Sequence, residues 1–309
     1  MKKVFFLIFS LLLVFSSCRK PNDDNNISSN NGNNNPLDSL YFFDSDSGIF
    51  DYAFYSPLSN KPFKVHYYIP NNVNRTTAPI LFVFPGANRN ADDYLNTWIS
   101  IADIKSLMVF SFEFGTNYYS SNEYQQGNIL DQNNNINHDS VWTFSVIEPV
   151  FDMIKSQLNY QPNYYDMFGH SAGAQFVHRY VLFKPNARIN RAVAANSGWY
   201  TVPDTSVLYP YGLKNSSLSI NQIQSAFNQH LEIHLGQNDN DPNDPYLRVT
   251  PEANLQGAHR LQRGRYFIDK CITLSNVYNS PSFNWVKKEV PNVGHNQVGM
   301  ANYAAEELY

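Results

Sequence analysis

Short apolar runs alternate with longer amphipathic stretches from about residue 40 to the end of the chain. The runs at 79–85, 107–114 and 164–169 are almost unbroken, which is typical of strands buried on both faces of a parallel sheet. Because consecutive parallel strands need long crossover connections, the stretches between the runs are expected to form helices. Other apolar runs predict further strands at 64–69, 189–197, 231–236 and 283–290.

Helical spacing of apolar residues recurs between these runs, most clearly where Tyr94, Trp98 and Ile101 repeat. Pro149 lies inside one such segment, so a kink or a late helix start is expected there. The alternation of strands and helices predicts an α/β fold, with a mostly parallel sheet covered by helices on both faces. Helices are expected at 91–106, 141–158, 171–183 and 253–277 and after residue 295, in one domain spanning 39–309.

The first residues of the chain carry a different pattern. Two lysines precede an apolar run of about twelve residues, which is too short to span a bilayer and is typical of a signal peptide. Ser16, Ser17 and Cys18 then resemble a bacterial lipobox, with Phe15 where leucine is usual. The resemblance implies a lipoprotein signal peptide at 1–17 and lipidation of Cys18. The protein would then be lipid-anchored to a membrane of the bacterial cell envelope, at the outer membrane or the cell surface.

A polar segment follows the lipobox. Residues 18–38 are rich in Asn, Asp and Ser and contain almost nothing apolar, so they predict a disordered tether between the lipidated Cys18 and the domain. Cys271 is the other cysteine of the chain, so no internal disulfide is expected if Cys18 carries lipid. Cys271 falls in a helical pattern and is expected to be a buried, inert thiol.

Composition narrows the possible partners. A length of 309 residues with 43% hydrophobic content is enough for one sizeable core or two modest domains. The net charge of −4, the pI near 6.0 and the lack of a basic run beyond Arg19–Lys20 give no reason to expect a nucleic-acid partner. Aromatic residues make up 15% of the chain; they either fill the core, which composition favours, or line a cleft for flat or sugar-like ligands.

The segment from Gly169 to Gly173 reads Gly-His-Ser-Ala-Gly and matches the G-x-S-x-G pattern. It lies between a predicted buried strand and a predicted helix, which is the context that a nucleophilic serine requires. The turn is so sharp that larger residues two positions before or after Ser171 would clash. The hydroxyl of Ser171 would then stand clear of the sheet at a helix N-terminus, where developing negative charge is stabilised.

A serine nucleophile needs a base. Among the eight histidines, His295 stands out because its loop joins the last predicted strand to the final predicted helix. From there its imidazole can reach the C-terminal edge of the sheet, where Ser171 is expected. His170 adjoins the serine but is expected to point away, and His178 is expected to be structural. A solvated loop histidine is the alternative interpretation of His295.

The base needs an orienting carboxylate, and three aspartates follow the next-to-last predicted strand. Asp239 is closest to the strand end and is preferred over Asp241 and Asp244. The alternate spacing of Asp239, Asp241 and Asn243 also suggests a calcium loop. An EF-hand would need glycine and glutamate where Asp244 and Thr250 stand, so that motif fails, whereas a looser ion site stays open.

Two backbone N–H groups are expected to bind the oxyanion. One belongs to Ala172, directly after the nucleophile, and the other to Ala87, which follows Pro85-Gly86 at the exit of a predicted strand. Asn88 is the alternative second donor. Losing one such donor typically costs roughly 3–4 kcal/mol of transition-state stabilisation.

The order Ser171, Asp239, His295 and the segments 84–94, 168–180, 195–200 and 290–300 resemble the α/β-hydrolase superfamily. They are most similar to the secreted polyhydroxybutyrate-depolymerase and feruloyl-esterase type, which usually has His-Gly where this chain has Pro85-Gly86. The resemblance implies an ester substrate, on a polyester or on side groups of a plant polysaccharide. Trp199 and Tyr200 would contact the substrate, or else fill the core at a strand end.

The sequence therefore predicts a serine esterase that transfers an acyl group to water through Ser171, His295 and Asp239. It contains no HExxH zinc motif, P-loop or dinucleotide fingerprint, so neither a metal nor an organic cofactor is expected. Two alternatives stay open. One is a non-catalytic surface lipoprotein that binds glycan through its aromatic residues. The other is a peptidase or lipase on the same fold.

Overall fold

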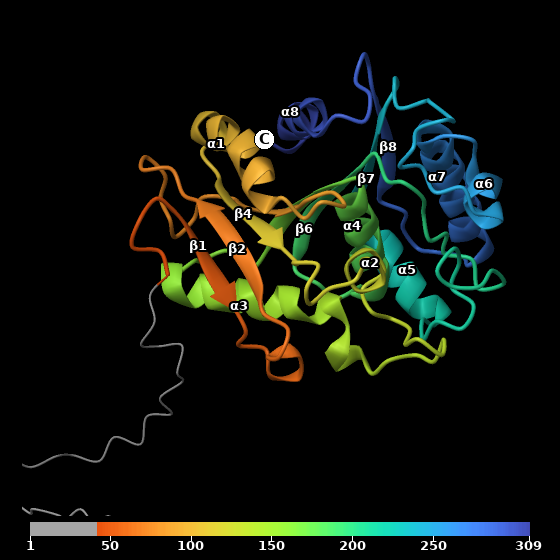
Figure 1. Ribbon diagram of the computed structural model, residues 1–309, viewed down its shortest axis with the longest axis horizontal. Coiled ribbons are helices and arrows are strands. Elements are labelled where there is room, and N and C mark those ends of the chain that lie inside the picture. Colours follow the sequence, from red (N-terminus) through yellow and green to blue (C-terminus); the bar gives the residue numbers. More distant parts are fainter. Residues whose placement is uncertain (1–41) are drawn as a thin grey trace, which may run out of the picture. The chain divides into compact units, whose positions relative to one another are not determined.

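A central sheet of eight strands organises the part of the chain that the computed structural model describes, residues 42–309 (Figure 1). Its strand order is β1-β2-β4-β3-β5-β6-β7-β8. β1 pairs with β2, and β2 with β4, in antiparallel fashion, whereas every other neighbouring pair is parallel. The strands are β1 Ser47–Tyr52, β2 Phe63–Tyr68, β3 Ile80–Phe84, β4 Met108–Glu113, β5 Tyr165–His170, β6 Ile189–Ala195, β7 Leu231–Gly236 and β8 Trp285–Val290.

The seven strands expected from the apolar runs are all present, and the mostly parallel sheet is confirmed. β1 was not expected. It is an edge strand that begins with Ser47 and Gly48 and buries only Phe50 and Tyr52 fully. Its sequence therefore reads as a turn, and its pairing with β2 is a tertiary effect.

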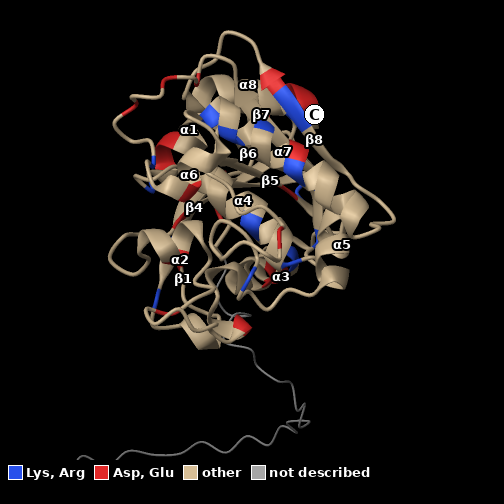
Figure 2. Cartoon of the chain, turned by 90° about the vertical axis from the view of Figure 1, so that its right-hand side faces the viewer, with Lys and Arg blue, Asp and Glu red and all other residues tan. Residues whose placement is uncertain are grey.

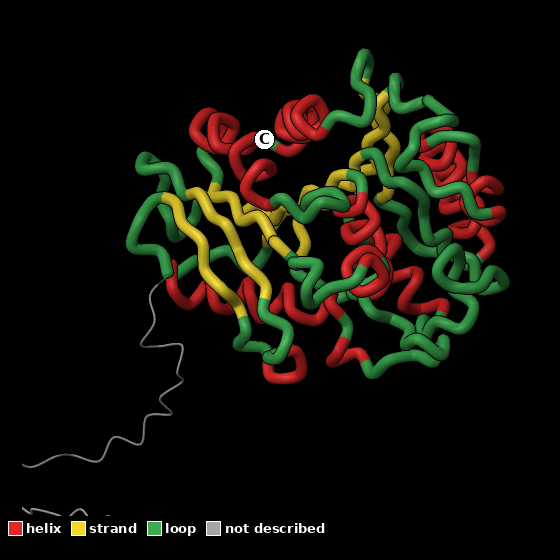
Figure 3. The backbone as a smooth tube through the Cα atoms, viewed as in Figure 1, coloured by secondary structure: helices red, strands yellow, loops and turns green. Residues whose placement is uncertain are grey.

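Helices cover both faces of the sheet, as expected (Figures 1 and 3). α1 and α8 pack side by side on one face, where their apolar residues share a core with β3, β4, β5, β6 and β8. α3, α4, α5 and α7 cover the opposite face, where ring contacts join α3 to β5 and α4 to α7. The α-helices are α1 Ala91–Lys105, α2 Ser121–Gln125, α3 Ile147–Leu158, α4 Ala172–Phe183, α5 Ile220–Asn228, α6 Pro251–Gln256, α7 Arg260–Val277 and α8 Gln297–Leu308, and the 3-10 turns are η2 Ser56–Leu58, η3 Asp139–Val141 and η4 Thr143–Val146.

Two helix boundaries test the sequence pattern, and one of them differs from it. The single helix expected over 253–277 is instead two helices, separated at Gly257, whose φ of 149° no helix can contain. The side chain of His259 then caps α7 by accepting the N–H of Gln262. The late start expected near Pro149 is confirmed, because α3 begins at Ile147 and places the proline in a first turn that needs no N–H donor.

Aromatic rings fill much of the core under α4. Phe84 stacks on Phe112 and on Phe176, with ring centroids 5.0 and 4.5 Å apart. Cys271 lies fully buried in α7, and burial raises the pKa of its thiol well above the usual value, as expected for an inert cysteine. No helix within residues 42–309 is both long and apolar enough to cross a bilayer. The signal peptide, Cys18 and the tether of residues 18–38 lie outside the described residues.

Candidate active site

Ser171 occupies the turn between β5 and α4 in a strained conformation, with φ 58° and ψ −113°. Its N–H donates to the carbonyl oxygen of Ala195 at 2.9 Å, which ties the turn to β6. A Cβ atom on Gly169 would lie 2.2 Å from the carbonyl oxygen of Gly173, and one on Gly173 would lie 1.9 Å from that of Phe84. The expectation that both flanking glycines are sterically required is confirmed.

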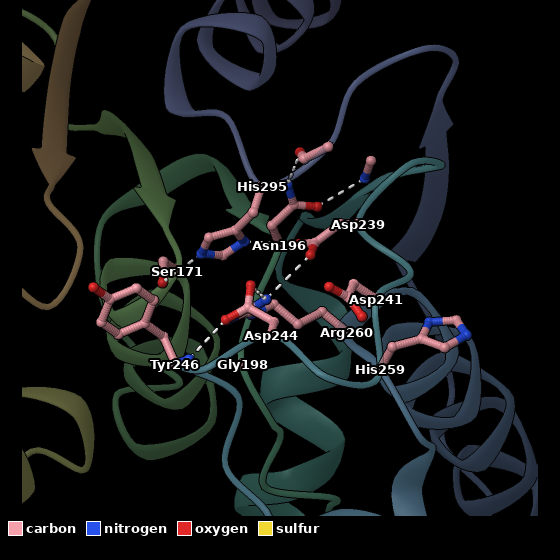
Figure 4. A network of polar contacts seen from close by, with 12 residues as sticks. Ser171, Asn196, Gly198, Asp239, Asp241, Asp244, Tyr246, His259, Arg260 and His295 are labelled. Carbon is pink, nitrogen blue, oxygen red and sulfur yellow. Dashed lines mark hydrogen bonds and ion pairs between the residues drawn. The ribbon is translucent and has the colours of Figure 1, made fainter.

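Ser171, His295 and Asp239 meet beyond the C-terminal ends of β5, β7 and β8 (Figure 4). Nε2 of His295 lies 3.0 Å from Oγ of Ser171, and its Nδ1 lies 2.7 Å from Oδ2 of Asp239. An Nδ1–H that donates to the carboxylate leaves Nε2 unprotonated and able to accept the hydroxyl proton. The side chain of Asp239 is only 5% exposed, whereas that of His295 is 26% exposed and open to a substrate.

The loop after β7 separates the three candidate aspartates. Asp239 closes a tight turn directly after the strand and is the one that contacts His295. Asp241 is exposed and accepts the N–H of Asn243. Asp244 is turned toward α7 (Figure 4). The preference for Asp239 over Asp241 as the partner of the histidine therefore agrees with the geometry.

Arg260, at the start of α7, links two of these carboxylates. Its Nη1 lies 3.2 Å from Oδ1 of Asp239 and 2.7 Å from Oδ2 of Asp244, and the residue is 3% exposed (Figure 4). The hydrogen bond from Arg260 is the largest cause that lowers the pKa of Asp244. Asp239 is thus held on both oxygens, by a cation on one side and by His295 on the other.

The two expected oxyanion donors lie next to the serine. Ala172 is the first residue of α4, and neither its N–H nor that of Ala87 donates a hydrogen bond within residues 42–309. The carbonyl oxygen of Gly86 accepts the N–H of Arg89 at 3.1 Å, so the N–H of Ala87 points the opposite way across the trans peptide. A Cβ atom on Gly86 would lie 3.7 Å from that of Ser171, which places this loop against the nucleophile.

Solved structures of hydrolases share this arrangement of elements. Poly(aspartic acid) hydrolase-1 of Sphingomonas sp. KT-1 is 39% identical, with a TM-score of 0.79, over 84% of this chain and 97% of that one. The chain belongs to the α/β-hydrolase superfamily.

Other solved hydrolases have a similar fold. The poly(3-hydroxybutyrate) depolymerase LpqC of Bordetella parapertussis is 27% identical, with a TM-score of 0.81, over 85% of this hydrolase and 89% of that chain. An S-formylglutathione hydrolase of Agrobacterium tumefaciens, 13% identical with a TM-score of 0.51, covers 85% of this chain and 92% of its own and shares the fold. No protein-family model and no curated protein matches the sequence.

A cavity of about 550 Å³ in this hydrolase is lined by Ser171 and His295. Ala87 and Asn88, the two candidates for the second oxyanion donor, both belong to its wall. Trp199 lines the cavity, although the residue is only 2% exposed. The expectation that Tyr200 contacts the substrate is not supported, because its ring is fully buried and stacks on Phe267 in the core.

Asn196, at the end of β6, joins the loops that carry the acid and the base. Its Oδ1 accepts the N–H of Gly236 at 2.7 Å, and its Nδ2 donates to the carbonyl oxygen of Gly294 at 2.8 Å (Figure 4). It is 1% exposed and adopts a φ of 51°, a left-handed conformation that asparagine tolerates. Gly294 immediately precedes His295, so this side chain positions the base.

The two histidines nearest the nucleophile in sequence have different environments. His170 does not simply point away; its ring centroid lies 4.8 Å from that of His295, and its Nδ1 pairs with the hydroxyl of Tyr94. Desolvation, followed by the charges of His295 and Arg260, lowers the pKa of His170 well below the usual value. His178 is buried, with its Nδ1 paired with the carbonyl oxygen of Ala174 and its Nε2 accepting the N–H of Thr201, and it is structural, as expected.

Sequence reasoning missed four residues that shape the site: Asn196, Tyr246, Arg248 and Arg260. Tyr246 is 90% exposed and, with Arg248, forms a wall of the cavity in the loop that follows the aspartates. The position of that loop after a predicted strand is the one signal that pointed to these two. Within residues 42–309 no group of three or more His, Cys, Asp or Glu side chains is placed to share a metal ion.

Proposed function

We propose that this protein is a serine hydrolase that cleaves carboxylic esters through a covalent acyl-enzyme. Ser171 is the nucleophile, His295 the general base and acid, and Asp239 the carboxylate that orients the imidazole. The observation that carries the proposal is the unbroken hydrogen-bonded chain from Ser171 Oγ through His295 to Asp239, built on a strained turn at a helix N-terminus. Structural packing alone gives no reason for such strain.

The reaction follows from this geometry. Nε2 of His295 takes the proton of Ser171 as the oxygen attacks the ester carbonyl, and the Asp239 carboxylate stabilises the imidazolium. The N–H groups of Ala172 and Ala87 hold the oxyanion, and His295 then protonates the leaving alcohol. A water molecule, deprotonated by His295, releases the acid and restores the serine.

A polymeric ester is the proposed substrate class, either a polyester or an ester on polysaccharide side groups. The structural similarity to a poly(3-hydroxybutyrate) depolymerase supports a polyester. Tyr246 also stands almost fully exposed at the wall of the cavity. An exposed aromatic wall can contact an extended chain that runs past the site.

Amide hydrolysis is the second candidate. The relative that is 39% identical is named a poly(aspartic acid) hydrolase, and the same serine, histidine and aspartate can cleave an amide when His295 protonates the departing amine. A screen of butyrate, feruloyl and 3-hydroxybutyrate esters beside poly(aspartic acid) separates the two. Turnover of poly(aspartic acid) with no turnover of any ester would select the amide hydrolase.

The deciding experiment compares the purified protein with Ser171→Ala on chromogenic p-nitrophenyl esters. We expect Ser171→Ala to lose about a thousandfold or more of kcat. Ser225→Ala is the matched control, because Ser225 is exposed on α5 and does not line the cavity of Ser171. Equal turnover by the parent and Ser171→Ala would refute the mechanism. Glycan binding without turnover, unchanged in Ser171→Ala, would instead favour a non-catalytic binding protein.

A further inference from the structure

The cavity over Ser171 carries positive charge and no negative charge of its own. Its lining contains two arginines, Arg248 and Arg260, and no aspartate, glutamate or lysine. The two arginines are not equivalent. Arg260 is paired with two carboxylates, those of Asp239 and Asp244, which lie behind the lining and more than balance its single charge. Arg248 forms no ion pair with any residue of 42–309, so its charge is available to a ligand.

Arg248 is held in place by neutral aromatic groups. Its Nε donates to the hydroxyl of Tyr211 at 2.7 Å, and its guanidinium lies 4.9 Å from the ring centroid of Trp199. Its terminal nitrogens donate no hydrogen bond within residues 42–309, although the residue is exposed to the cavity. A guanidinium fixed at Nε with free Nη groups is suited to bind a carboxylate through two parallel hydrogen bonds.

Buried arginines behind the wall add to this charge. Arg179 is fully buried beneath Trp199, at 4.2 Å from the ring centroid, and donates to the carbonyl oxygens of Gln125 and Gln175, which belong to the lining. It is the blue segment of α4 in Figure 2. Arg89 is buried behind the oxyanion loop and donates to the carbonyl oxygen of Ala87.

Neither buried arginine has a carboxylate partner among the described residues. Burial lowers the pKa of Arg179 to about 10, so it stays charged at neutral pH. Burying a cation without a counter-ion costs free energy, and the field of such a cation is weakly screened inside the protein. An anionic ligand in the cavity would recover part of that cost, whereas a neutral ligand would not.

We propose that the substrate of this site carries a carboxylate near the scissile bond, and that Arg248 is the residue that selects it. The inference rests on the proposed function only in taking the cavity of Ser171 as the place where the substrate binds. The matching substrate class is an acidic polymer or an acidic ester, in place of the neutral polyester that the similarity to a poly(3-hydroxybutyrate) depolymerase supports. The same charge would attract such a polymer from solution, and added salt would weaken the attraction.

A pair of esters of equal length tests the selection. p-Nitrophenyl pentanoate ends in a methyl group, and mono-p-nitrophenyl glutarate ends in a carboxylate. For Arg248→Gln we expect the ratio of kcat/KM, glutarate over pentanoate, to fall about 10- to 100-fold below that of the parent, with Arg248→Lys in between. Arg265→Gln is the control, since it removes the same charge from an exposed side chain outside the cavity. An unchanged ratio in Arg248→Gln would overturn the proposal for an anion on the acyl side.

A binding measurement covers an anion on the other side of the scissile bond and does not depend on turnover. Calorimetry with full-length Ser171→Ala should show soluble poly(aspartic acid) binding that weakens about 10-fold or more when Arg248→Gln is added, and that also weakens with salt. The selection of an anion is rejected if the ester ratio is unchanged and poly(aspartic acid) either does not bind or binds with the same affinity in the presence and absence of Arg248→Gln. If the parent protein hydrolyses no ester although poly(aspartic acid) still binds, the ester chemistry is rejected and the selection of an anion is not.

Discussion

The bridge made by Asn196 provides a quantitative test of how the site is assembled. Replacing Asn196 by glycine keeps the left-handed backbone at φ 51° without strain but removes both hydrogen bonds to Gly236 and Gly294. The N–H of Gly236 is buried, and leaving it unpaired costs about 1–3 kcal/mol. The carbonyl of Gly294 is half-buried and can be rehydrated, so its loss costs about 0.5–1.5 kcal/mol.

The expected loss in the free energy of unfolding is therefore about 1.5–4.5 kcal/mol. Glycine also adds about 0.4–1 kcal/mol of unfolded-chain entropy, which a matched control removes. Asn159→Gly is that control, because Asn159 also has a left-handed φ, of 50°, but is exposed and its side chain bonds to nothing within residues 42–309. The difference between the two variants in equilibrium urea unfolding, followed by tryptophan fluorescence, isolates the bridge.

Activity adds a second measurement on the same pair. Because Gly294 precedes His295, a loosened loop should lower kcat/KM on a p-nitrophenyl ester by about 10- to 100-fold at concentrations of urea where the variant is still folded. Asn159→Gly should keep the parent value. The reasoning is wrong if Asn196→Gly is less than about 0.5 kcal/mol below Asn159→Gly and retains full activity.

Two further predictions concern the elbow and the surface. Gly173→Ala should destabilise the protein by more than about 3 kcal/mol and remove activity, because its Cβ would lie 1.9 Å from the carbonyl oxygen of Phe84. Gly115→Ala is the control and should change stability little, because the space around that position is open. Equal urea midpoints for the two variants would contradict the steric argument. The hydrogen bond from Arg265 lowers the pKa of Glu289 to about 2, so the carboxylate stabilises the fold above the ordinary value of 4.5 and loses that contribution as the pH falls toward 2. Glu289→Gln should thus be less stable than the parent at pH 7 and converge with it in acid, and a gap that persists at the lowest pH would exclude this origin.

The local parts of the site could be predicted from the sequence. A buried strand, a glycine-flanked serine and a helix are consecutive in the chain, so the pattern of residues 164–183 contains nearly all of the geometry of the elbow. His295 and Asp239 were found because each follows a strand, and the ends of parallel strands meet at one edge of the sheet. Gly257 shows the limit even of local patterns, because helical spacing continues through a residue whose backbone breaks the helix.

Tertiary structure alone decided the charges and supports around that local core. Arg260 contacts Asp239 across 21 positions of sequence, and Asn196 contacts Gly294 across 98. No periodicity connects such residues, since their meeting depends on strand order and loop paths rather than on the preference of any segment. The sequence by itself determined that a serine would be presented at the edge of a parallel sheet. Which of Trp199 and Tyr200 reaches the cavity, and which arginines are left without a counter-ion, depend on packing, because each is a choice among chemically similar residues that only their three-dimensional surroundings distinguish.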